Sequence, residues 1–199
     1  MPTRRILLVG ATGTIGAAVA AALAGRYAVI AASRTRATHH VDLTRIESIQ
    51  DLFRQVGSVD AVVCAAGDAR FAPLLDLEDE DYQFSVQHKL MGQVNLVRVA
   101  LGQIADGGSI TLTSGILASK PMRGSAAISL VNAALEGFTR AAALEAPRNI
   151  RVNIVSPPWV TETLMALQMD PAQGMPATTV AQAYVRSIEG GDTGRVIEP

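Results

Sequence analysis

The chain has 199 residues, of which 49% are hydrophobic and only 4% aromatic. Its 17 basic and 18 acidic residues give a net charge of -1, which argues against a surface for nucleic acid or anionic membrane. The lone cysteine, Cys64, excludes a disulfide within the chain and favours a reducing, cytoplasmic setting. The length fits one domain, residues 1–199, and the first apolar run is too short for a signal peptide or a membrane span.

Aliphatic runs and helical patterns alternate from end to end. The runs predict strands at 6–9, 28–32, around Val41, and at 60–65, 109–113, 150–155 and 195–197. The helical spacing of apolar residues predicts helices at 15–23, 46–56, 82–104, 126–144 and 178–188. Such alternation is typical of right-handed βαβ units. The sequence therefore predicts an α/β protein with a doubly wound parallel sheet, a Rossmann fold with three αβα layers.

A glycine-rich loop joins the first strand to the first helix. It reads Gly10-Ala11-Thr12-Gly13-Thr14-Ile15-Gly16. Gly10 suits a tight turn, Gly13 lets a pyrophosphate approach the backbone, and Gly16 lets the helix pack on the strand. The free N–H groups of the helix N-terminus favour phosphate. The alternative is a plain glycine-rich turn, but its place between strand and helix favours dinucleotide binding.

The end of the second strand indicates which dinucleotide is bound. NAD-specific proteins of this fold usually carry an acid there to bind the ribose 2′-hydroxyl. This chain has Ser33 and Arg34 instead, a hydroxyl and a guanidinium that suit a 2′-phosphate. The sequence therefore predicts NADP(H); the alternative is an ordinary solvated basic loop.

Two further segments end strands at the edge where open α/β sheets bind ligands. Asp42-Leu43 follows the third strand, and Asp42 is a candidate acceptor for the adenine amino group. Its alternative role is to cap the next helix. Ala65-Ala66-Gly67 ends the fourth strand and is small enough for a ribose to lie against the backbone. The neighbouring Cys64 is interpreted as a small buried hydrophobe.

Taken together, these segments make the whole chain resemble the short-chain dehydrogenase/reductase family. The resemblance rests on the segments above and on three more: 108–114, 133–140, and 150–153 before Ser156-Pro157. It implies a nicotinamide cofactor, which Pro157 and Val160 also help to bind, and a small carbonyl or alcohol as substrate. It also implies a homodimer or homotetramer joined through the two long helices, the second of which is rich in alanine.

The family pattern is altered at the active site. The resemblance implies an Asn on the first long helix, a Ser after strand five, and a Tyr-x-x-x-Lys on the second long helix. Ser114 fits the Ser position, Lys89 stands where the Asn is expected, and Ile128 and Asn132 stand at the Tyr and Lys positions. The candidate catalytic residues are therefore Ser114, Lys89 and Asn132. Ile128 cannot donate a proton.

Other residues are candidates to replace the missing acid. His88 and Lys89 flank the expected Asn position, and Tyr184 lies on the last helix near the expected substrate pocket. Each also has an ordinary structural interpretation. His39-His40 lacks a third ligand, so no metal site is predicted.

Two hypotheses about function remain. The first is an NADP(H)-dependent oxidoreductase of the short-chain type, in which Ser114 holds the substrate oxygen and Lys89, His88 or water supplies the proton. The second is a protein that binds NADP(H) without turnover, because it keeps the cofactor loops and lacks the acid–base pair. The fold alone cannot choose between them.

Overall fold

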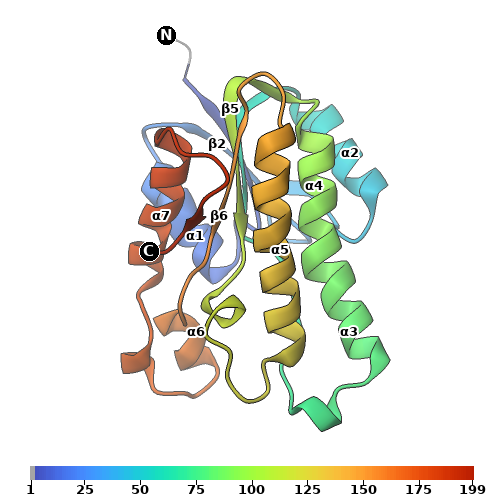
Figure 1. Ribbon diagram of the computed structural model, residues 1–199. Coiled ribbons are helices and arrows are strands. Elements are labelled where there is room, and N and C mark those ends of the chain that lie inside the picture. The colour runs from blue at the N-terminus through green and yellow to red at the C-terminus, as the bar shows by residue number, and fades with distance from the viewer. Residues whose placement is uncertain (1–2) are drawn as a thin grey trace.

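The aliphatic runs pair into one sheet in the computed structural model, which describes residues 3–199 (Figure 1). Across these residues seven strands are all paired in parallel, in the order β3-β2-β1-β4-β5-β6-β7. The doubly wound parallel sheet predicted from the sequence is confirmed. The strands are β1 (Arg5–Val9), β2 (Ala28–Ser33), β3 (His39–His40), β4 (Val59–Cys64), β5 (Ile104–Thr113), β6 (Arg151–Val155) and β7 (Val196–Ile197).

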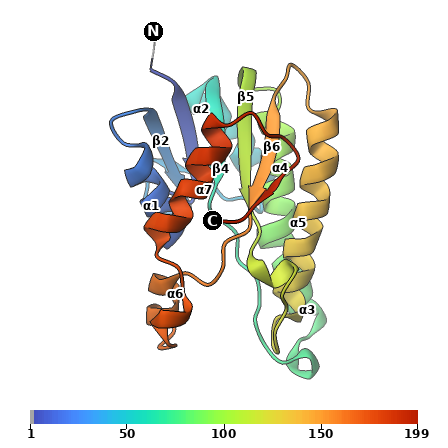
Figure 2. The ribbon, with the colours of Figure 1, turned by 60° about the vertical axis from the view of Figure 1, so that its left-hand side comes forward.

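Helices cover both faces of this sheet, as Figures 1 and 2 show. On one face α1 (Thr14–Leu23) packs beside α7 (Ala177–Glu189). On the other face lie α2 (Ile46–Val56), α4 (Gly92–Ala100) and α5 (Ala126–Glu145). Two apolar cores result, one between each helical layer and the sheet.

The alternation of side chains along β1 shows how one strand serves both cores. Ile6 and Leu8 belong to the core under α1 and α7, whereas Leu7 and Val9 belong to the core under α2, α4 and α5. Successive side chains of a strand point to opposite faces. A strand that is buried on both faces must therefore be a continuous aliphatic run, which is the pattern seen in the sequence.

Two predicted elements are corrected by the structure. The third strand is the pair His39–His40 rather than a strand around Val41, which follows it in the chain. The helix expected over 82–104 is divided into α3 (Asp79–Ser85), a π-helical segment η2 (Val86–Met91) and α4, and Ile104 already belongs to β5. An apolar period near 3.6 does not reveal a π-helical turn, and such turns are frequent at functional sites.

The carboxyl ends of the strands define the edge where ligands are expected. In Figures 1 and 2 this edge faces downward, away from the N-terminus, and carries α3, α6 (Thr161–Ala166) and the segments that connect them to the sheet. Three short 3-10 turns, η1 (Leu74–Asp76), η3 (Ile116–Ala118) and η4 (Pro171–Gln173), lie in these connections.

Candidate functional site

Two cavities lie at the carboxyl edge of the sheet and share one stretch of backbone. Ala65, Ala66 and Gly67, which follow β4, line both. The first cavity, of about 250 Å³, has mainly apolar walls. The second, of about 300 Å³, is lined by the glycine loop and by the segments after β2 and β3. A single extended ligand can therefore pass from one cavity to the other over Ala65–Gly67.

The glycine loop has the geometry that its sequence predicts. Gly10 has φ +85°, and a Cβ there would lie 2.6 Å from the Ala65 carbonyl oxygen, so both conformation and space require glycine. A Cβ on Gly16 would lie 2.0 Å from the Gly10 carbonyl oxygen, so Gly16 allows α1 to begin against β1. Gly13, the residue before α1, is exposed and makes no side-chain cap, which leaves the first N–H groups of the helix open to a phosphate.

Basic side chains gather beside this loop at the end of β2. Arg34 is exposed and lines the second cavity, and Ser33 is buried beside it. The Ser33 hydroxyl accepts a hydrogen bond from the Arg36 backbone N–H at 3.0 Å, so its own hydrogen remains available. The Arg36 guanidinium also lines the cavity and donates to the Thr12 carbonyl at 3.1 Å. Arg36 was not among the cofactor-binding residues predicted from the sequence, although its position two residues after Arg34 indicated that it would lie near the same phosphate site.

Asp42 and Leu43 lie on the far wall of the second cavity. Asp42 Oδ1 accepts hydrogen bonds from the Thr44 hydroxyl at 2.7 Å and the Thr44 backbone N–H at 3.0 Å. The Thr44 hydroxyl bond is the main reason that the pKa of Asp42 is lowered, so this wall carries a carboxylate. Asp42 does not cap α2, which begins at Ile46 after Arg45.

His88 lines this second cavity as well, and its ring stacks on Phe84 with centroids 4.0 Å apart. It is not among the residues that line the first cavity with Ser114. The structure thus places His88 with the second cavity rather than beside Ser114, and its role as a proton donor stays a prediction. His88 is positioned to form a wall for the half of a ligand that lies in the second cavity.

The first cavity contains the expected catalytic positions together. Ser114, Lys89, Asn132 and Ile128 all line it; Ser114 directly follows β5, Lys89 lies in η2, and Asn132 and Ile128 lie in α5. Ile15 from α1 and Pro157 and Val160 from the β6–α6 connection line it as well. Thr14 and Gly16 are not among the lining residues of either cavity; Gly16 packs against the Gly10 backbone, and Thr14 is the first residue of α1.

Lys89 is a buried cation in this cavity. It is 8% exposed, its Nζ donates to the Ser114 carbonyl at 3.1 Å, and its chain passes over Gly67. A Cβ on Gly67 would lie 2.8 Å from Lys89 Cγ, so the glycine makes room for the lysine. Burial lowers the pKa of Lys89 to about 8, against a smaller opposite effect of Cys64 and Asp68. The pKa of the ammonium is therefore close enough to neutral pH for Lys89 to give up its proton.

The Ser114 hydroxyl, expected to hold the substrate oxygen, instead makes a hydrogen bond within the protein. It donates to Glu136 Oε1 at 2.9 Å, and Glu136 lies one turn beyond Asn132 on α5. A hydroxyl has only one hydrogen to donate, so Ser114 presents lone pairs rather than a donor to the cavity. This contact with Glu136 was not predicted from the sequence, since no local pattern links Glu136 to Ser114.

The side-chain oxygen of Asn132 makes no hydrogen bond with the described residues. Its Nδ2 donates weakly to the Gly115 carbonyl at 3.5 Å, whereas its buried Oδ1 has no hydrogen-bond partner among the described residues. Buried polar atoms are rarely left unpaired in folded proteins. Asn132 Oδ1 is therefore available to accept a hydrogen bond from a ligand in the cavity.

Tyr184 is excluded as a proton donor to this cavity. It is fully buried between α7 and the sheet rather than at the pocket, and its hydroxyl lies 2.7 Å from Thr113 Oγ1. Burial raises its pKa well above the ordinary value. Cys64 is buried too, and burial raises the pKa of its thiol to about 12, as expected for a small hydrophobe.

A sequence model of a family described as enoyl-(acyl carrier protein) reductase matches residues 10–197. This range contains the glycine loop, all the residues that line the first cavity and all but Val9 of those that line the second. The chain belongs to the short-chain dehydrogenase/reductase family.

Relatives within this family differ in length from the chain. Carbonyl reductase family member 4 of Danio rerio is 32% identical over 163 residues, which are 79% of this chain and 64% of that protein. The same protein of Xenopus tropicalis is 32% identical over 137 residues, 65% of this chain and 58% of that protein. The chain thus spans about six tenths of the length of these curated relatives.

Solved structures of similar length are also known. The protein lin1944 from Listeria innocua is 40% identical, with a TM-score of 0.94 over 98% of both chains. A small-chain dehydrogenase solved in complex with NADPH is 27% identical, with a TM-score of 0.88 over 99% of this chain and 96% of that one.

None of the helices within residues 3–199 combines the length and apolarity needed to cross a membrane. In the same part of the chain no cluster of three or more His, Cys, Asp or Glu side chains could hold a metal ion.

Proposed function

We propose that the protein is an NADP(H)-dependent oxidoreductase that interconverts a small carbonyl compound and its alcohol. The observation that carries the proposal is the pair of cavities joined over Ala65–Gly67. One combines a helix N-terminus with basic side chains, and the other combines apolar walls with a buried amine. Membership of the family and the names of the carbonyl reductases among its relatives support this function.

The residues of the second cavity fit NADP(H). The open turn at Gly13 and the N-terminus of α1 would hold the pyrophosphate, and Ser33 with Arg34 would hold the 2′-phosphate. Arg36, fixed on the glycine loop, adds a second guanidinium to that phosphate site. Asp42 and Leu43 would line the adenine, Ala65–Gly67 the ribose, and Ile15, Pro157 and Val160 the nicotinamide. When bound, the cofactor supplies a hydride.

Lys89 is the proposed proton donor in the first cavity. A hydride added to a carbonyl carbon leaves negative charge on the oxygen, which must take up a proton. Among the residues that line this cavity, only Lys89 carries a charge. Transfer of its proton to the oxygen removes both the buried positive charge and the new negative charge, so burial favours the step. Ile128 cannot take part in this transfer.

Asn132 and Ser114 would complete the site. The unpaired Asn132 Oδ1 would accept a hydrogen bond from a ligand hydroxyl and so orient it. The Ser114 carbonyl holds Lys89 Nζ in place, and the Ser114 hydroxyl is fixed by Glu136. In this proposal the substrate oxygen is held by Lys89, whereas the sequence predicted that Ser114 would hold it.

A second candidate function is the binding of NADP(H) without turnover. The observation that favours it is Ile128, which places an inert side chain on the cavity wall where the family pattern has a tyrosine. The Ser114 hydroxyl donates to Glu136 rather than to a ligand in the cavity, which also favours binding without turnover. Such a protein would keep its contacts with the phosphates of NADP(H) but would not reduce a carbonyl compound.

Cofactor titration combined with a turnover screen separates the candidates. Purified protein is titrated with NADPH and NADH and then assayed with NADPH and a panel of aldehydes and ketones. Lys89→Met is the test variant, and Lys120→Met, at an exposed position, is its matched control. Turnover that Lys89→Met abolishes and Lys120→Met preserves supports the oxidoreductase. NADPH binding without turnover favours the second candidate, and failure to bind NADPH contradicts both.

A further inference from the structure

Two aromatic rings meet at the first cavity. Trp159, the only tryptophan of the chain, lines the cavity from the β6–α6 connection. Phe71, from the segment between β4 and α3, packs edge to face against it, with centroids 6.2 Å apart and planes at 75°. Phe71 is not itself among the lining residues, so it supports the cavity through its contact with Trp159. In a chain with only 4% aromatic residues, we call Trp159, packed against Phe71, the aromatic wall of the cavity.

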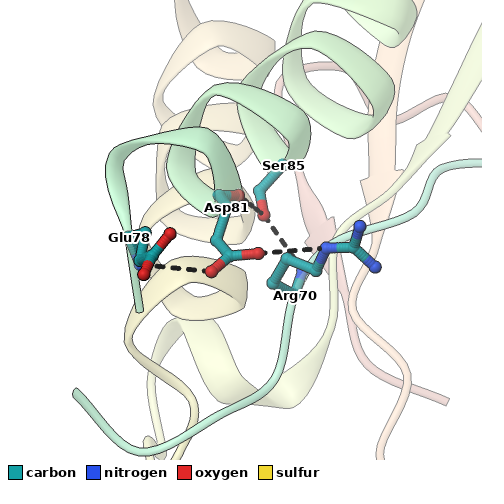
Figure 3. Close-up of polar contacts among 4 residues, drawn as sticks. All are labelled: Arg70, Glu78, Asp81 and Ser85. Carbon is teal, nitrogen blue, oxygen red and sulfur yellow. Dashed lines mark hydrogen bonds and ion pairs between the residues drawn. The ribbon is translucent and has the colours of Figure 1, made fainter. Parts of the chain in front are cut away.

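The segment that carries Phe71 is held in place from the α3 side. The Arg70 backbone N–H donates to Ser85 Oγ at 3.0 Å, and Arg70 Nε lies 3.3 Å from Asp81 Oδ1, as Figure 3 shows. Asp81 also accepts from the Glu78 backbone N–H at 3.1 Å. The Arg70 guanidinium lies 4.0 Å above the centroid of the Phe84 ring. Arg70 is therefore fixed by three groups of α3, one of which, Asp81, is itself held by the N-terminal turn of that helix.

The other side of the segment is fixed by the turn before α5. The Ala72 backbone N–H donates to the Gly124 carbonyl at 3.0 Å. Gly124 has φ +86°, and a Cβ there would lie 3.0 Å from Cε1 of the Phe71 ring. The glycine thus lets the turn lie directly against the ring. Phe71 is held between this turn and Trp159, so the aromatic wall is formed before a ligand arrives.

The charges around the cavity limit the kind of substrate it can hold. Lys89 is the one charged side chain among its lining residues. The others are uncharged: aliphatic side chains such as Ile116, Leu117, Ile128 and Pro158, and the polar Thr113, Ser114, Asn132 and Thr163. A charged substrate group placed on these walls would lose its hydration without compensation. A carboxylate paired with Lys89 would hold the ammonium proton in place and oppose the proposed transfer.

We propose that the substrate of this cavity is an uncharged carbonyl compound with an aromatic ring, whose ring contacts Trp159, held in place by Phe71, while its oxygen faces Lys89. The inference rests on the proposed function for the identity of the reacting group. The ring preference itself rests on the aromatic wall and can be tested by binding alone. The nicotinamide would share this cavity of about 250 Å³, so the room left for a substrate favours a small compound with a single ring over an extended chain.

Three methyl ketones with the same reacting group provide the test: acetophenone, cyclohexyl methyl ketone and 4-acetylbenzoate. Each is titrated into the protein saturated with NADP⁺, so that no turnover occurs. Trp159 gives a single indole N–H signal in a ¹H–¹⁵N spectrum because the chain has no other tryptophan. The shift of this signal reports binding at the aromatic wall, and the titration gives a dissociation constant for each ketone.

Acetophenone is expected to shift the indole signal and to bind about threefold to tenfold more tightly than cyclohexyl methyl ketone, as edge-to-face ring contacts allow. It is expected to bind at least about tenfold more tightly than 4-acetylbenzoate. Phe71→Leu, which removes the ring packed against Trp159, should reduce the preference for the aromatic ring. Leu75→Ala, a change at an exposed apolar residue of η1 in the same segment, should leave the preference unchanged.

Several results would overturn the inference. Equal affinity for the aromatic and saturated ketones would show that the rings do not select the substrate. Tighter binding of 4-acetylbenzoate would identify Lys89 as a carboxylate site instead. No effect of any ketone on the indole signal, with NADP⁺ bound, would also reject the aromatic wall. By contrast, failure of NADP⁺ itself to bind rejects the proposed function, so the two failures are distinguishable.

Discussion

Replacing Lys89 by methionine should change how the stability of the protein depends on pH. The lysine is 8% exposed, and burial lowers its pKa from the ordinary 10.5 to about 8. Since a difference of one pKa unit corresponds to about 1.4 kcal/mol, burying the charged form costs about 3 kcal/mol. Methionine has a similar length and no charge, so Lys89→Met removes this cost together with the bond to the Ser114 carbonyl.

The direction of the effect follows from proton linkage. The folded state releases the Lys89 proton near pH 8 and the unfolded state near pH 10.5, so between these values the unfolded chain binds more protons. The free energy of unfolding of the wild type must therefore rise with pH across this window, relative to the variant. Below pH 8 both states of the wild type are protonated, and the full cost of burial remains.

Urea unfolding of the cofactor-free protein at pH 7, 8, 9, 10 and 10.5 measures this difference. The stability of the wild type minus that of Lys89→Met should increase by about 3 kcal/mol from pH 7 to pH 10.5. Lys120→Met is the control, because its exposed side chain should show no such dependence. A difference between wild type and Lys89→Met that stays constant across this range would refute the argument that Lys89 is a buried amine with a lowered pKa.

Three further predictions concern the cofactor, the catalytic residues and assembly. Arg34→Ala should weaken NADPH binding by about 1.5–3 kcal/mol, as loss of a charge-assisted contact does, and leave NADH unchanged in paired titrations; equal shifts would show that Arg34 does not contact the 2′-phosphate. Ile128→Tyr with Asn132→Lys should raise ketone reduction by up to about 10²–10⁴-fold, and either change alone should have little effect, in initial-rate assays; equal rates for single and double variants would contradict this. Light scattering should give a dimer or tetramer, which we expect to be joined through α4 and α5, since α5 exposes Leu130 and Leu144; a mass near 20.9 kDa at micromolar concentration would contradict it.

Sequence patterns predicted those parts of the molecule that local chemistry determines. The glycine loop requires glycine at Gly10 because of its φ and at Gly16 because of packing, and both constraints act within a few residues. The buried strands require aliphatic runs for the same local reason. The basic residues after β2 also follow a fixed position in this fold, so the phosphate cavity could be predicted in outline.

The contacts that define the chemistry of the first cavity could not be predicted in this way. Lys89 meets the Ser114 carbonyl across 25 positions of sequence, and Ser114 meets Glu136 across 22. Whether Lys89 faces the cavity or solvent depends on the π-helical turn of η2, which leaves no mark in the apolar pattern. His88, its neighbour in the chain, lines the other cavity for the same reason.

The central claim is that NADPH delivers hydride to a carbonyl carbon in the first cavity and that Lys89 supplies the proton. Single-turnover reduction of acetophenone with NADPH deuterated at C4, followed by mass spectrometry of the alcohol, tests it directly. The wild type should place one deuterium on the carbinol carbon, and Lys89→Met should slow the reaction by about 10²–10⁴-fold without weakening NADPH binding. A wild-type protein that binds NADPH and yields no deuterated alcohol, or a Lys89→Met variant with the wild-type rate, would contradict the claim.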